Sequence, residues 1–589
     1  MSLSRRRALQ VAGITGFSVI AARLVQFEAF EAEARAKDAR RTRQTTTTLR
    51  ALRGEIQDRN GIALASSMLV YDVAVNQLAI NQYEHVVKDD NGVSHIIGRG
   101  ALEAAAQLAP LLDMDARELG AKMIGDSTYV VIAKAIDQVV WRKIDALSIQ
   151  GIEQEQRVKR LYPAGNVASN IVGYAHDEKD EGSKNRYVKA ETGLELTQDK
   201  LLTGTDGYWQ YERSSSGQFI IPYVPERTVP ALQGSTVRTT LNADLQKVVQ
   251  DIVAKAMTTW SPEWISVLVT EPATGKVIVM ADSGSFDPTN PDATANTGTR
   301  TVEVVYEPGS VGKVVTFAAA LEEQKTKPED TWNVPDYWSA PNGQVFEDSH
   351  HHGTIQMTTT KVLVDSSNVG TVQIGDRLDD AVRHEYMRKF GWGELTGIEL
   401  PGESPGLLSE AATWDGRTRY TTMFGQGVAC TPLQAVQTLA TIANGGVRVP
   451  LRVVDSWVAP DGARTEQSTP EGIRVISEET AKTLTEMLIE VTQKGGTAQT
   501  AAVDGYLVAG KTGTTEVIEG GTQTGNVASF VGFLPARAPA AAVSVIVHKP
   551  AHGIYGGVIA APIFREVALA TMHALGISPD PSVVASPSQ

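Results

Sequence analysis

The segment "VYEPGSVGKVVTFAAAL", residues 305–321, places a serine and a lysine one helical turn apart in a run that is otherwise almost wholly apolar. Pro308 and Gly309 disfavour helix before this point, so we expect Ser310 at or near a helix N-terminus, with Lys313 on the same face. The residues after Lys313 leave almost no polar stripe, which is typical of a buried helix. The sequence therefore predicts a lysine that is buried beside a serine.

Burial would change the chemistry of this lysine. Desolvation disfavours the charged form, so we expect the pKa of Lys313 to lie below its usual value of about 10.4. The helix dipole at this end also disfavours an ammonium and favours an oxyanion on Ser310. Because a neutral amine can take the proton of a hydroxyl, Ser310 is a candidate nucleophile with Lys313 as its base. The plain alternative is an ordinary helix start whose lysine reaches the surface.

Two further polar elements follow this segment along the chain. The first, "VDSSNVGTV" at 364–372, is predicted as a loop between helices and offers a hydroxyl relay and an amide. The second, "GYLVAGKTGTTEV" at 505–517, is predicted as an apolar strand that carries a lysine and several hydroxyls. A lone Ser-x-x-Lys pair arises by chance in a chain of this length, but the ordered set does not. The candidate residues are Ser366, Ser367 and Asn368 in the first element, and Lys511, Thr512, Gly513 and Thr514 in the second.

These residues suit a pocket for a peptide that carries a carboxylate. Gly513 has no side chain, so an extended peptide could lie along this strand and be aligned by main-chain hydrogen bonds. We expect Lys511 to supply positive charge to the carboxylate, and Thr512 and Thr514 to supply hydroxyls. The backbone N–H groups of Ser310 and Thr514 are the natural donors to a tetrahedral intermediate.

Composition narrows the classes of function. The chain has 589 residues, of which 42% are hydrophobic, and this length implies two or more domains. Its formal net charge of -14 argues against general nucleic-acid binding. The single cysteine, Cys430, excludes an internal disulfide and is interpreted as a packing residue. His350, His351 and His352 are interpreted as a solvated loop, because three consecutive imidazoles cannot all face one ion. We expect no metal and no cofactor.

The first residues indicate the compartment. Arg5, Arg6 and Arg7 precede an uncharged stretch from Ala8 to Ala22. A spanning helix needs about 20 apolar residues, so this stretch is short. We expect an uncut single-pass anchor with its basic end in the cytoplasm, because no convincing small-x-small cleavage site follows the apolar core. A twin-arginine signal sequence is the alternative, and both place the bulk of the chain outside the cytoplasm.

Changes in composition divide the rest of the chain. The proline-bearing segment "PYVPERTVPALQGS" at 222–235 is the best boundary between a mixed α and β region and a second unit that begins with a strand and a helix capped by Asn242 or Asp244. The predicted parts are a cytoplasmic tip and anchor at 1–27, a stalk at 28–48, an N-terminal domain at 49–227, a second domain at 228–575 and a disordered tail at 576–589.

The ordered elements Ser310-x-x-Lys313, Ser366-x-Asn368 and Lys511-Thr512-Gly513 resemble the signature of β-lactamases and penicillin-binding proteins. From residue 49 to 570 the chain resembles the class B penicillin-binding proteins, which are peptidoglycan D,D-transpeptidases, and more specifically their septal, cell-division type and actinobacterial members. The other segments that carry the resemblance are "RGEIQDRNGIALA" at 53–65, "RLYPAGNVASNIVGY" at 160–174, "ETGLEL" at 191–196, "GIELPGE" at 397–403, "FGQGVACTPLQ" at 424–434 and "SFVGFLPA" at 529–536.

The resemblance implies an α+β multidomain fold. An elongated, mixed α/β pedestal similar to a dimerisation domain would precede a transpeptidase domain with an antiparallel sheet flanked by helices. It also implies a serine acyl-enzyme that cross-links stem peptides in septal wall synthesis and that β-lactams inactivate. The implied roles are Ser310 as nucleophile, Lys313 as base, Ser366 and Asn368 as proton relay and substrate contact, and Lys511, Thr512, Gly513 and Thr514 as the substrate-binding strand.

The implied partners are peptidoglycan stem peptides, β-lactams, a membrane glycosyltransferase of the SEDS family and other division proteins in the bacterial cell membrane. Two alternatives stay open. A β-lactamase would share the three elements, although it usually has about half this length. A penicillin-recognising sensor or division scaffold would keep the site without using it.

Overall fold

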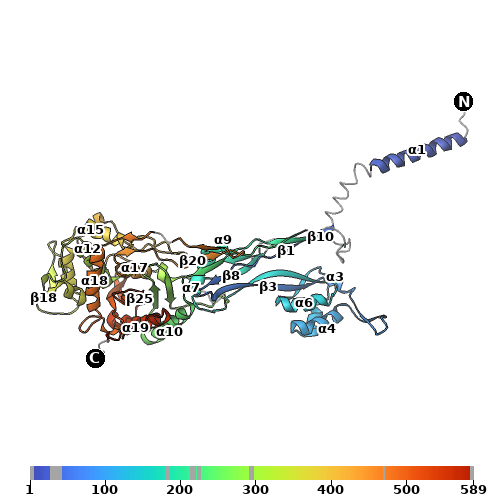
Figure 1. The fold of residues 1–589 in the computed structure, drawn as a ribbon. Coiled ribbons are helices and arrows are strands. Elements are labelled where there is room, and N and C mark those ends of the chain that lie inside the picture. The colour runs from blue at the N-terminus through green and yellow to red at the C-terminus, as the bar shows by residue number, and fades with distance from the viewer. Residues whose placement is uncertain are drawn as a thin grey trace. The chain divides into compact units, whose positions relative to one another are not determined.

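The computed structural model describes residues 5–26, 43–179, 186–212, 221, 227–290, 297–468 and 471–583 (Figure 1). The chain forms two compact units, each made of segments that are distant in sequence. The N-terminal unit comprises Met1–Leu52, Leu69–Lys159 and Gly204–Gln233. The C-terminal unit comprises Arg53–Met68, Arg160–Thr203 and Gly234–Gln589.

The N-terminal unit has a small α/β core. The second half of β3 (Ala63–Val75) pairs antiparallel with β6, and short helices pack against them around buried residues such as Leu108, Ile132 and Trp141. A separate sheet has the order β1-β10-β11. The other elements of this unit are α1 (Arg5–Gln26), β1 (Gln44–Leu49), α3 (Gln77–Ile80), β4 (Glu84–Lys88), β5 (Ser94–Arg99), α4 (Gly100–Leu112), α5 (Ala116–Met123), β6 (Val130–Asp137), α6 (Gln138–Ala146), β7 (Ile152–Leu161), β10 (Gly207–Glu212) and β11 (Arg227–Val229).

The N-terminal segments differ in part from the expectation. Among the described residues, α1 included, no helix is both long and apolar enough to cross a membrane. Residues 28–42, most of the predicted stalk, lie outside the described residues, as does residue 27 of the predicted anchor. Residues 44–48 of that stalk belong to β1 and pair with β10, because a run of β-branched threonines favours an extended strand.

The C-terminal unit is organised around an antiparallel five-stranded sheet in the order β14-β13-β25-β24-β23. Every residue of β13 and β14 is buried, because helices cover both faces. Figure 1 shows α10 and α19 on one side of β25 and α17 with α18 on the other. The predicted antiparallel sheet flanked by helices is confirmed. Its strands are β13 (Trp264–Thr270), β14 (Val277–Asp282), β23 (Ala509–Glu519), β24 (Thr522–Leu534) and β25 (Ala541–His548).

The helix cap and the glycine turn that the sequence predicts for this unit are both observed. Asn242 caps α10, since its side chain accepts a hydrogen bond from the Leu245 N–H at 3.0 Å. Gly61 has a φ of 90° in the turn between β2 and β3. The main helices are α10 (Ala243–Trp260), α12 (Lys313–Glu322), α13 (Thr359–Val364), α14 (Asn368–Gly375), α15 (Asp380–Lys389), α17 (Pro432–Ala443), α18 (Glu478–Glu490) and α19 (Gly556–Ala574).

The remaining elements of this unit are short. They are β2 (Ile56–Gln57), α7 (Ser169–Val172), β8 (Ala175–Lys179), β9 (Arg186–Ala190), α8 (Gly193–Thr197), α9 (Asp199–Leu202), β12 (Thr236–Thr239), α11 (Arg300–Glu303), β15 (Thr331–Val334), β16 (Tyr337–Ser339), β17 (Val345–Glu347), β18 (Ile355–Thr358), α16 (Thr418–Thr421), β19 (Val447–Arg448), β20 (Val454–Val458), β21 (Arg464–Glu466) and β22 (Ile473–Arg474).

Part of the predicted disordered tail is docked on this unit. The Asp580 N–H donates to the Gly505 carbonyl at 2.8 Å, and the Gly505 N–H donates to the Val583 carbonyl at 2.9 Å. The Tyr506 hydroxyl donates to the Ile577 carbonyl at 2.7 Å. These contacts order the tail as far as residue 583, and the last six residues lie outside the described part.

Candidate active site

Ser310 lies in a 3-10 turn, Gly309–Gly312, that leads directly into α12. The turn packs against the edge strand β23. Gly309 has a φ of 52°, and a Cβ at this position would lie 2.0 Å from the Thr515 hydroxyl oxygen. Glycine is therefore required for the serine turn to approach the strand so closely. The predicted place of Ser310, at a helix N-terminus one turn before Lys313, is the observed one.

Lys313 is the first residue of α12, and its side chain is fully buried. Its Nζ donates to the Ser366 carbonyl and, at 2.8 Å, to Asn368 Oδ1. It also lies 3.3 Å from Ser366 Oγ. The amine thus bridges the helix that begins beside Ser310 and the segment that follows α13. Ser366 lies in the predicted loop, whereas Asn368 is the first residue of α14.

Lys511 approaches the same hydroxyl from β23. It is fully buried, and its Nζ donates to Ser366 Oγ at 2.9 Å. The sequence suggested that Lys511 would present positive charge to a substrate carboxylate. In the structure this amine is buried, and it contacts Ser366 and its own neighbour, Thr512.

Burial governs the protonation of both amines. Desolvation holds the pKa of Lys313 well below its ordinary value, the neighbouring Lys511 lowers it further, and Asp348 opposes the shift. Desolvation also lowers the pKa of Lys511 to about 7. Since two ammonium groups that share one hydroxyl repel each other, at least one amine is held neutral near neutrality. The arrangement can therefore take up a proton from a hydroxyl.

Ser366 adopts a left-handed backbone conformation with a φ of 61°. This conformation is costly for a residue with a Cβ, and it places the Ser366 carbonyl and hydroxyl where Lys313 reaches both. In the described part of the chain the Ser310 hydroxyl makes no hydrogen bond within the protein. The resting site thus has a free serine hydroxyl and a buried amine that is already engaged with the loop residues.

Gly513 and the threonines complete the β23 side of the site. A Cβ on Gly513 would lie 2.2 Å from Ser529 Oγ and 3.0 Å from the Pro308 carbonyl oxygen. This glycine therefore lets the serine turn pack on the strand, a reason that differs from the peptide clearance expected from the sequence. The Thr514 hydroxyl accepts a hydrogen bond from the Gly556 N–H at 3.2 Å, and Thr512 Oγ1 lies 3.3 Å from Thr497 Oγ1.

Comparison with known proteins identifies the family. The profile described as the penicillin-binding protein transpeptidase domain matches residues 265–569, which is more than half of the chain. The chain belongs to the family of penicillin-binding protein transpeptidases. The profile of the penicillin-binding protein dimerisation domain matches residues 48–239. This order of domains confirms the predicted class B type.

Several relatives are similar to this penicillin-binding protein over most of their length. "Penicillin-binding protein PbpB" of Mycolicibacterium smegmatis is 37% identical over 81% of this chain and 75% of the relative. PbpB of Mycobacterium tuberculosis is 34% identical over 90% of this chain and 79% of the relative. The crystal structure of a peptidoglycan synthetase from Bifidobacterium adolescentis is 31% identical, with a TM-score of 0.73 over 93% of this chain and 98% of that chain. The predicted resemblance to septal proteins of actinobacterial type is confirmed.

Sequence reasoning missed some residues that organise the site of this transpeptidase domain. The Glu307 carboxylate accepts from the Gly427 N–H at 2.9 Å, and burial raises the pKa of Glu307. The Gly309 N–H donates to the Gly425 carbonyl at 2.9 Å. The Asp348 carboxylate accepts hydrogen bonds from the start of α14. The sequence pattern gave no signal for Asp348, which lies two positions before the first histidine of the run.

Two features among the described residues bear on metal binding and on thiol chemistry. One group, His176, Glu178 and Glu191, has ligand atoms within 4.8 Å of one another. The Lys189 ammonium already occupies it, 3.2 Å from Glu178 Oε2 and 3.1 Å from Glu191 Oε1. Cys430 is fully buried and burial raises its pKa, in accord with its interpretation as a packing residue.

Proposed function

We propose that this chain is a peptidoglycan D,D-transpeptidase that cross-links stem peptides through an acyl-enzyme on Ser310, in septal wall synthesis. The observation that supports this most strongly is the buried Lys313 amine, which is one turn from Ser310 and bonded to Asn368 Oδ1 at 2.8 Å. Relatives are named accordingly, including "Peptidoglycan D,D-transpeptidase FtsI" of Escherichia coli at 28% identity.

In the first step, Ser310 Oγ attacks the carbonyl carbon of the penultimate D-alanine of a stem peptide. The neutral Lys313 amine takes the serine proton, and a tetrahedral intermediate forms. When this intermediate collapses, the C–N bond to the terminal D-alanine breaks and the departing amine takes up a proton through Ser366. The products are free D-alanine and an ester on Ser310.

In the second step, an amine from a neighbouring strand attacks the ester carbonyl. Lys313 takes a proton from that amine, and the Ser310 oxygen leaves and is reprotonated. A new amide cross-link forms and the enzyme is regenerated. The energy comes from the cleaved peptide bond, so the proposal needs no nucleotide.

The strand β23 is the proposed binding strand for the donor peptide. It is the edge of the five-stranded sheet, and an edge strand can pair with an extended segment. We assign the carboxylate contact to the Thr512 and Thr514 hydroxyls, with Lys511 behind them as a source of protons for Ser366. Asn368 would contact the peptide from the opposite side while holding Lys313.

β-Lactams would acylate Ser310 by imitating the donor peptide. A structure titled as penicillin binding protein 3 from Mycobacterium tuberculosis complexed with aztreonam is 29% identical to this chain, with a TM-score of 0.67. We further propose that the chain is anchored in the cell membrane by its N-terminal segment, and that it works with a SEDS-family glycosyltransferase and other division proteins. The boundaries 1–27, 28–48, 49–227, 228–575 and 576–589 stay predictions.

Labelling with a fluorescent penicillin tests the proposal. We expect wild-type protein to be labelled covalently, Ser310→Ala to be unlabelled, and peptide mass spectrometry to place the adduct on residue 310. Ser349→Ala is the matched control, because Ser349 is an exposed serine outside the three elements. Persistent labelling of folded Ser310→Ala, or an adduct on another side chain, contradicts the assignment.

A further inference from the structure

The loop that contains the histidine run, residues 348–353, is attached to the start of α14 through Asp348. The Asp348 carboxylate accepts from Ser367 Oγ at 2.6 Å and from the Val369 N–H at 3.0 Å. It also accepts from the Asn368 N–H. The Asp348 side chain is only 7% exposed. One buried carboxylate thus holds the first turn of the helix whose first residue, Asn368, binds Lys313.

His352 is the second partner of this carboxylate. Its Nε2 lies 3.2 Å from Asp348 Oδ2, and its Nδ1 lies 2.7 Å from the Gly353 carbonyl oxygen. Both partners are acceptors only, so both ring nitrogens must donate, and only the imidazolium carries two N–H groups. The hydrogen bond to Gly353 and the Asp348 carboxylate raise the pKa of His352, although desolvation opposes them. The geometry therefore favours a positive charge beside Asp348.

The other charged or titratable groups near His352 either raise its pKa further or make no contact with the pair of His352 and Asp348. The Asp336 carboxylate also raises the pKa of His352, and it lies 3.3 Å from Nδ1 of the exposed His351. His350 contacts the ring of Tyr555, with ring centroids 6.1 Å apart. Among the three histidines, His352 is therefore the one that bonds to the carboxylate at α14.

The charge on Asp348 matters for Lys313. Asp348 raises the pKa of Lys313, against the effect of burial, so an uncompensated carboxylate favours the ammonium form of that amine. A cation at His352 offsets this charge. It also fixes Asp348 Oδ2, which accepts from Ser367, and so keeps the carboxylate aligned with the helix start.

We propose that His352 is a positioning residue for the acyl-transfer reaction, which as an imidazolium holds the Asp348 carboxylate against the start of α14 and offsets its charge near Lys313. This inference rests on the proposed function, in which Lys313 is the base. The exposed histidines of the same run, His350 and His351, have no such role.

The direction of the pH dependence follows from the sign of the shift. The folded pKa of His352 is raised, so the imidazolium is present at low pH and is lost as pH rises through that raised value. Its contribution to the rate is therefore largest at low pH. Deprotonation of Lys313 raises the acylation rate as pH rises and so acts in the opposite direction. The informative quantity is therefore the ratio of the wild-type acylation rate to that of a His352 variant at each pH.

The experiment measures the second-order rate of acylation by a fluorescent penicillin as a function of pH in wild type, His352→Gln and His351→Gln. We expect His352→Gln to be ~10-fold slower than wild type near pH ~6, the size of one charge-assisted hydrogen bond, and within about twofold near pH ~8.5. His351→Gln should follow wild type throughout. A ratio that is constant with pH, or equal rates, overturns the proposal, because a merely structural role gives no pH dependence.

A second variant separates positioning from folding. Asp348→Asn weakens the acceptor that holds the start of α14 and should slow acylation, although the loss of its charge near Lys313 acts in the opposite direction. Adding His352→Gln to it should cause no further loss, because both act through one contact. If the losses in acylation rate multiply in the double variant, the two residues act independently and the inference is contradicted. Thermal melting of each variant identifies those that fail to fold. Adduct mapping keeps the outcomes distinct: an adduct away from Ser310 contradicts the proposed function, whereas a flat ratio with the adduct on Ser310 contradicts only the role of His352.

Discussion

The C-terminal unit buries positive charge in two different ways. In the Glu195 cluster, which we define as Arg53, Arg160 and Glu195, each guanidinium donates to one oxygen of a single carboxylate, at 2.6 and 2.7 Å. All three side chains are at most 2% exposed. In the lysine pair, Lys313 and Lys511, no carboxylate bonds to either amine among the described residues.

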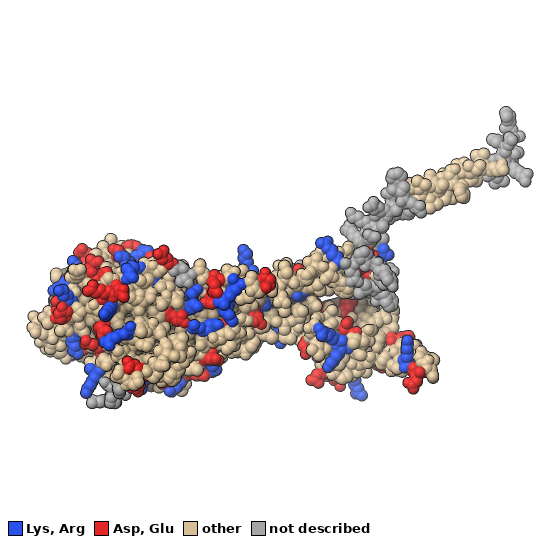
Figure 2. Space-filling view, viewed as in Figure 1, with Lys and Arg blue, Asp and Glu red and all other residues tan. Residues whose placement is uncertain are grey.

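The difference separates a structural cluster from a chemical one. The buried Glu195 carboxylate accepts from two guanidinium groups, so each charge of the Glu195 cluster has a partner of opposite sign, and removing one partner would leave buried charge uncompensated. The lysine pair lacks that compensation, and burial lowers the pKa of both amines instead. An amine that has lost its charge can act as a base, which a guanidinium cannot do. The surface shows the ordinary case, with acidic and basic side chains interspersed in water (Figure 2).

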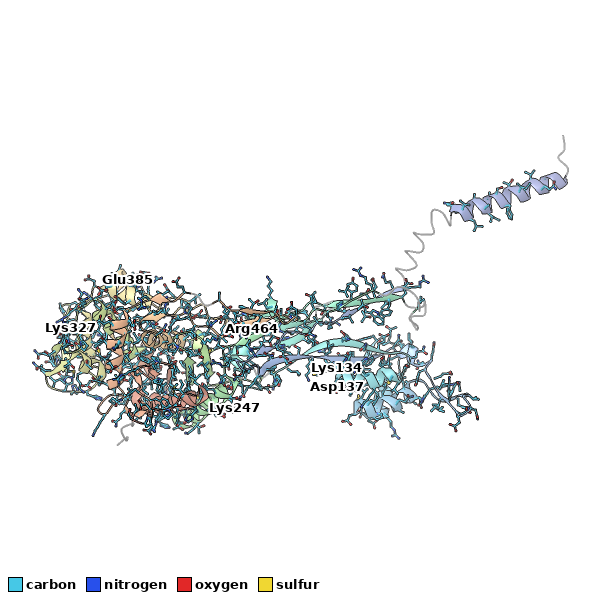
Figure 3. The ribbon with its side chains drawn as sticks, viewed as in Figure 1. Lys134, Asp137, Lys247, Lys327, Glu385 and Arg464 are labelled. Carbon is cyan, nitrogen blue, oxygen red and sulfur yellow. The ribbon has the colours of Figure 1, made fainter. Side chains whose placement is uncertain are left out.

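The substitution with the largest expected effect removes Lys313 from the lysine pair. Lys313→Met should lower the rate of acylation by ~10²- to 10⁴-fold, because it removes the proposed base for the Ser310 hydroxyl. The melting temperature should stay level or rise, since the variant no longer desolvates an unpaired amine. Lys247→Met is the control, because Lys247 is an exposed lysine at the surface of α10 (Figure 3). A variant that acylates at the wild-type rate contradicts the role of Lys313.

The next largest effect is expected from a substitution that disrupts the Glu195 cluster. Glu195→Gln leaves two guanidinium groups buried without their carboxylate and should cost about 3–5 kcal/mol in the free energy of unfolding. Urea unfolding measures this loss. The acylation rate per folded molecule should change little, because Glu195 lies outside the site. Unchanged stability would show that the Glu195 cluster does not hold the fold together.

A third prediction concerns how the free energy of unfolding depends on pH through Lys511 of the lysine pair. The pKa of Lys511 is about 7 in the folded chain against 10.5 ordinarily, so the unfolded chain binds an extra proton between these values. Stability should therefore rise with pH across this window, by up to about 1.4 kcal/mol per pH unit relative to Lys511→Met. Unfolding curves of both proteins at several pH values test this. Parallel pH profiles would mean that Lys511 stays protonated in the folded state.

The smallest effect concerns the rim of the Glu195 cluster. Asp199 accepts from Arg53 at 2.6 Å, but its side chain is 47% exposed. Asp199→Asn should cost no more than about 1 kcal/mol, because an exposed partner gains little from the pair and Glu195 remains in place. The same urea unfolding assay compares it with Glu195→Gln. Equal losses for the two variants would show that burial is not what gives the pair its strength.

The local parts of the site could be predicted from the sequence. The helix start at Ser310, the loop that carries Ser366 and the strand that carries Lys511 are all observed where spacing and composition placed them. The cap at Asn242 follows from the same kind of signal. Such features depend on contacts within a few residues, which a pattern of residue types contains.

Other parts depend on contacts that the pattern does not contain. Nothing in "EDSHHHG" indicates that Asp348 caps α14 or that His352, unlike its neighbours, donates to Asp348. The contact between Lys511 and Ser366 also lies outside the pattern, since the two residues are 145 positions apart. The docking of residues 577–583 near Gly505 was also missed, because a polar, proline-bearing tail is typical of disorder.

The sequence by itself determined the chemical inventory: a serine and a lysine one helical turn apart, a hydroxyl and an amide on a loop, and a lysine on an apolar strand. Only the tertiary structure decided which of these groups carry charge and which of them touch. The physical reason is that propensity and spacing act along a few residues, whereas desolvation and long-range hydrogen bonds arise when distant segments meet, and these set the pKa values of Lys313 and Lys511.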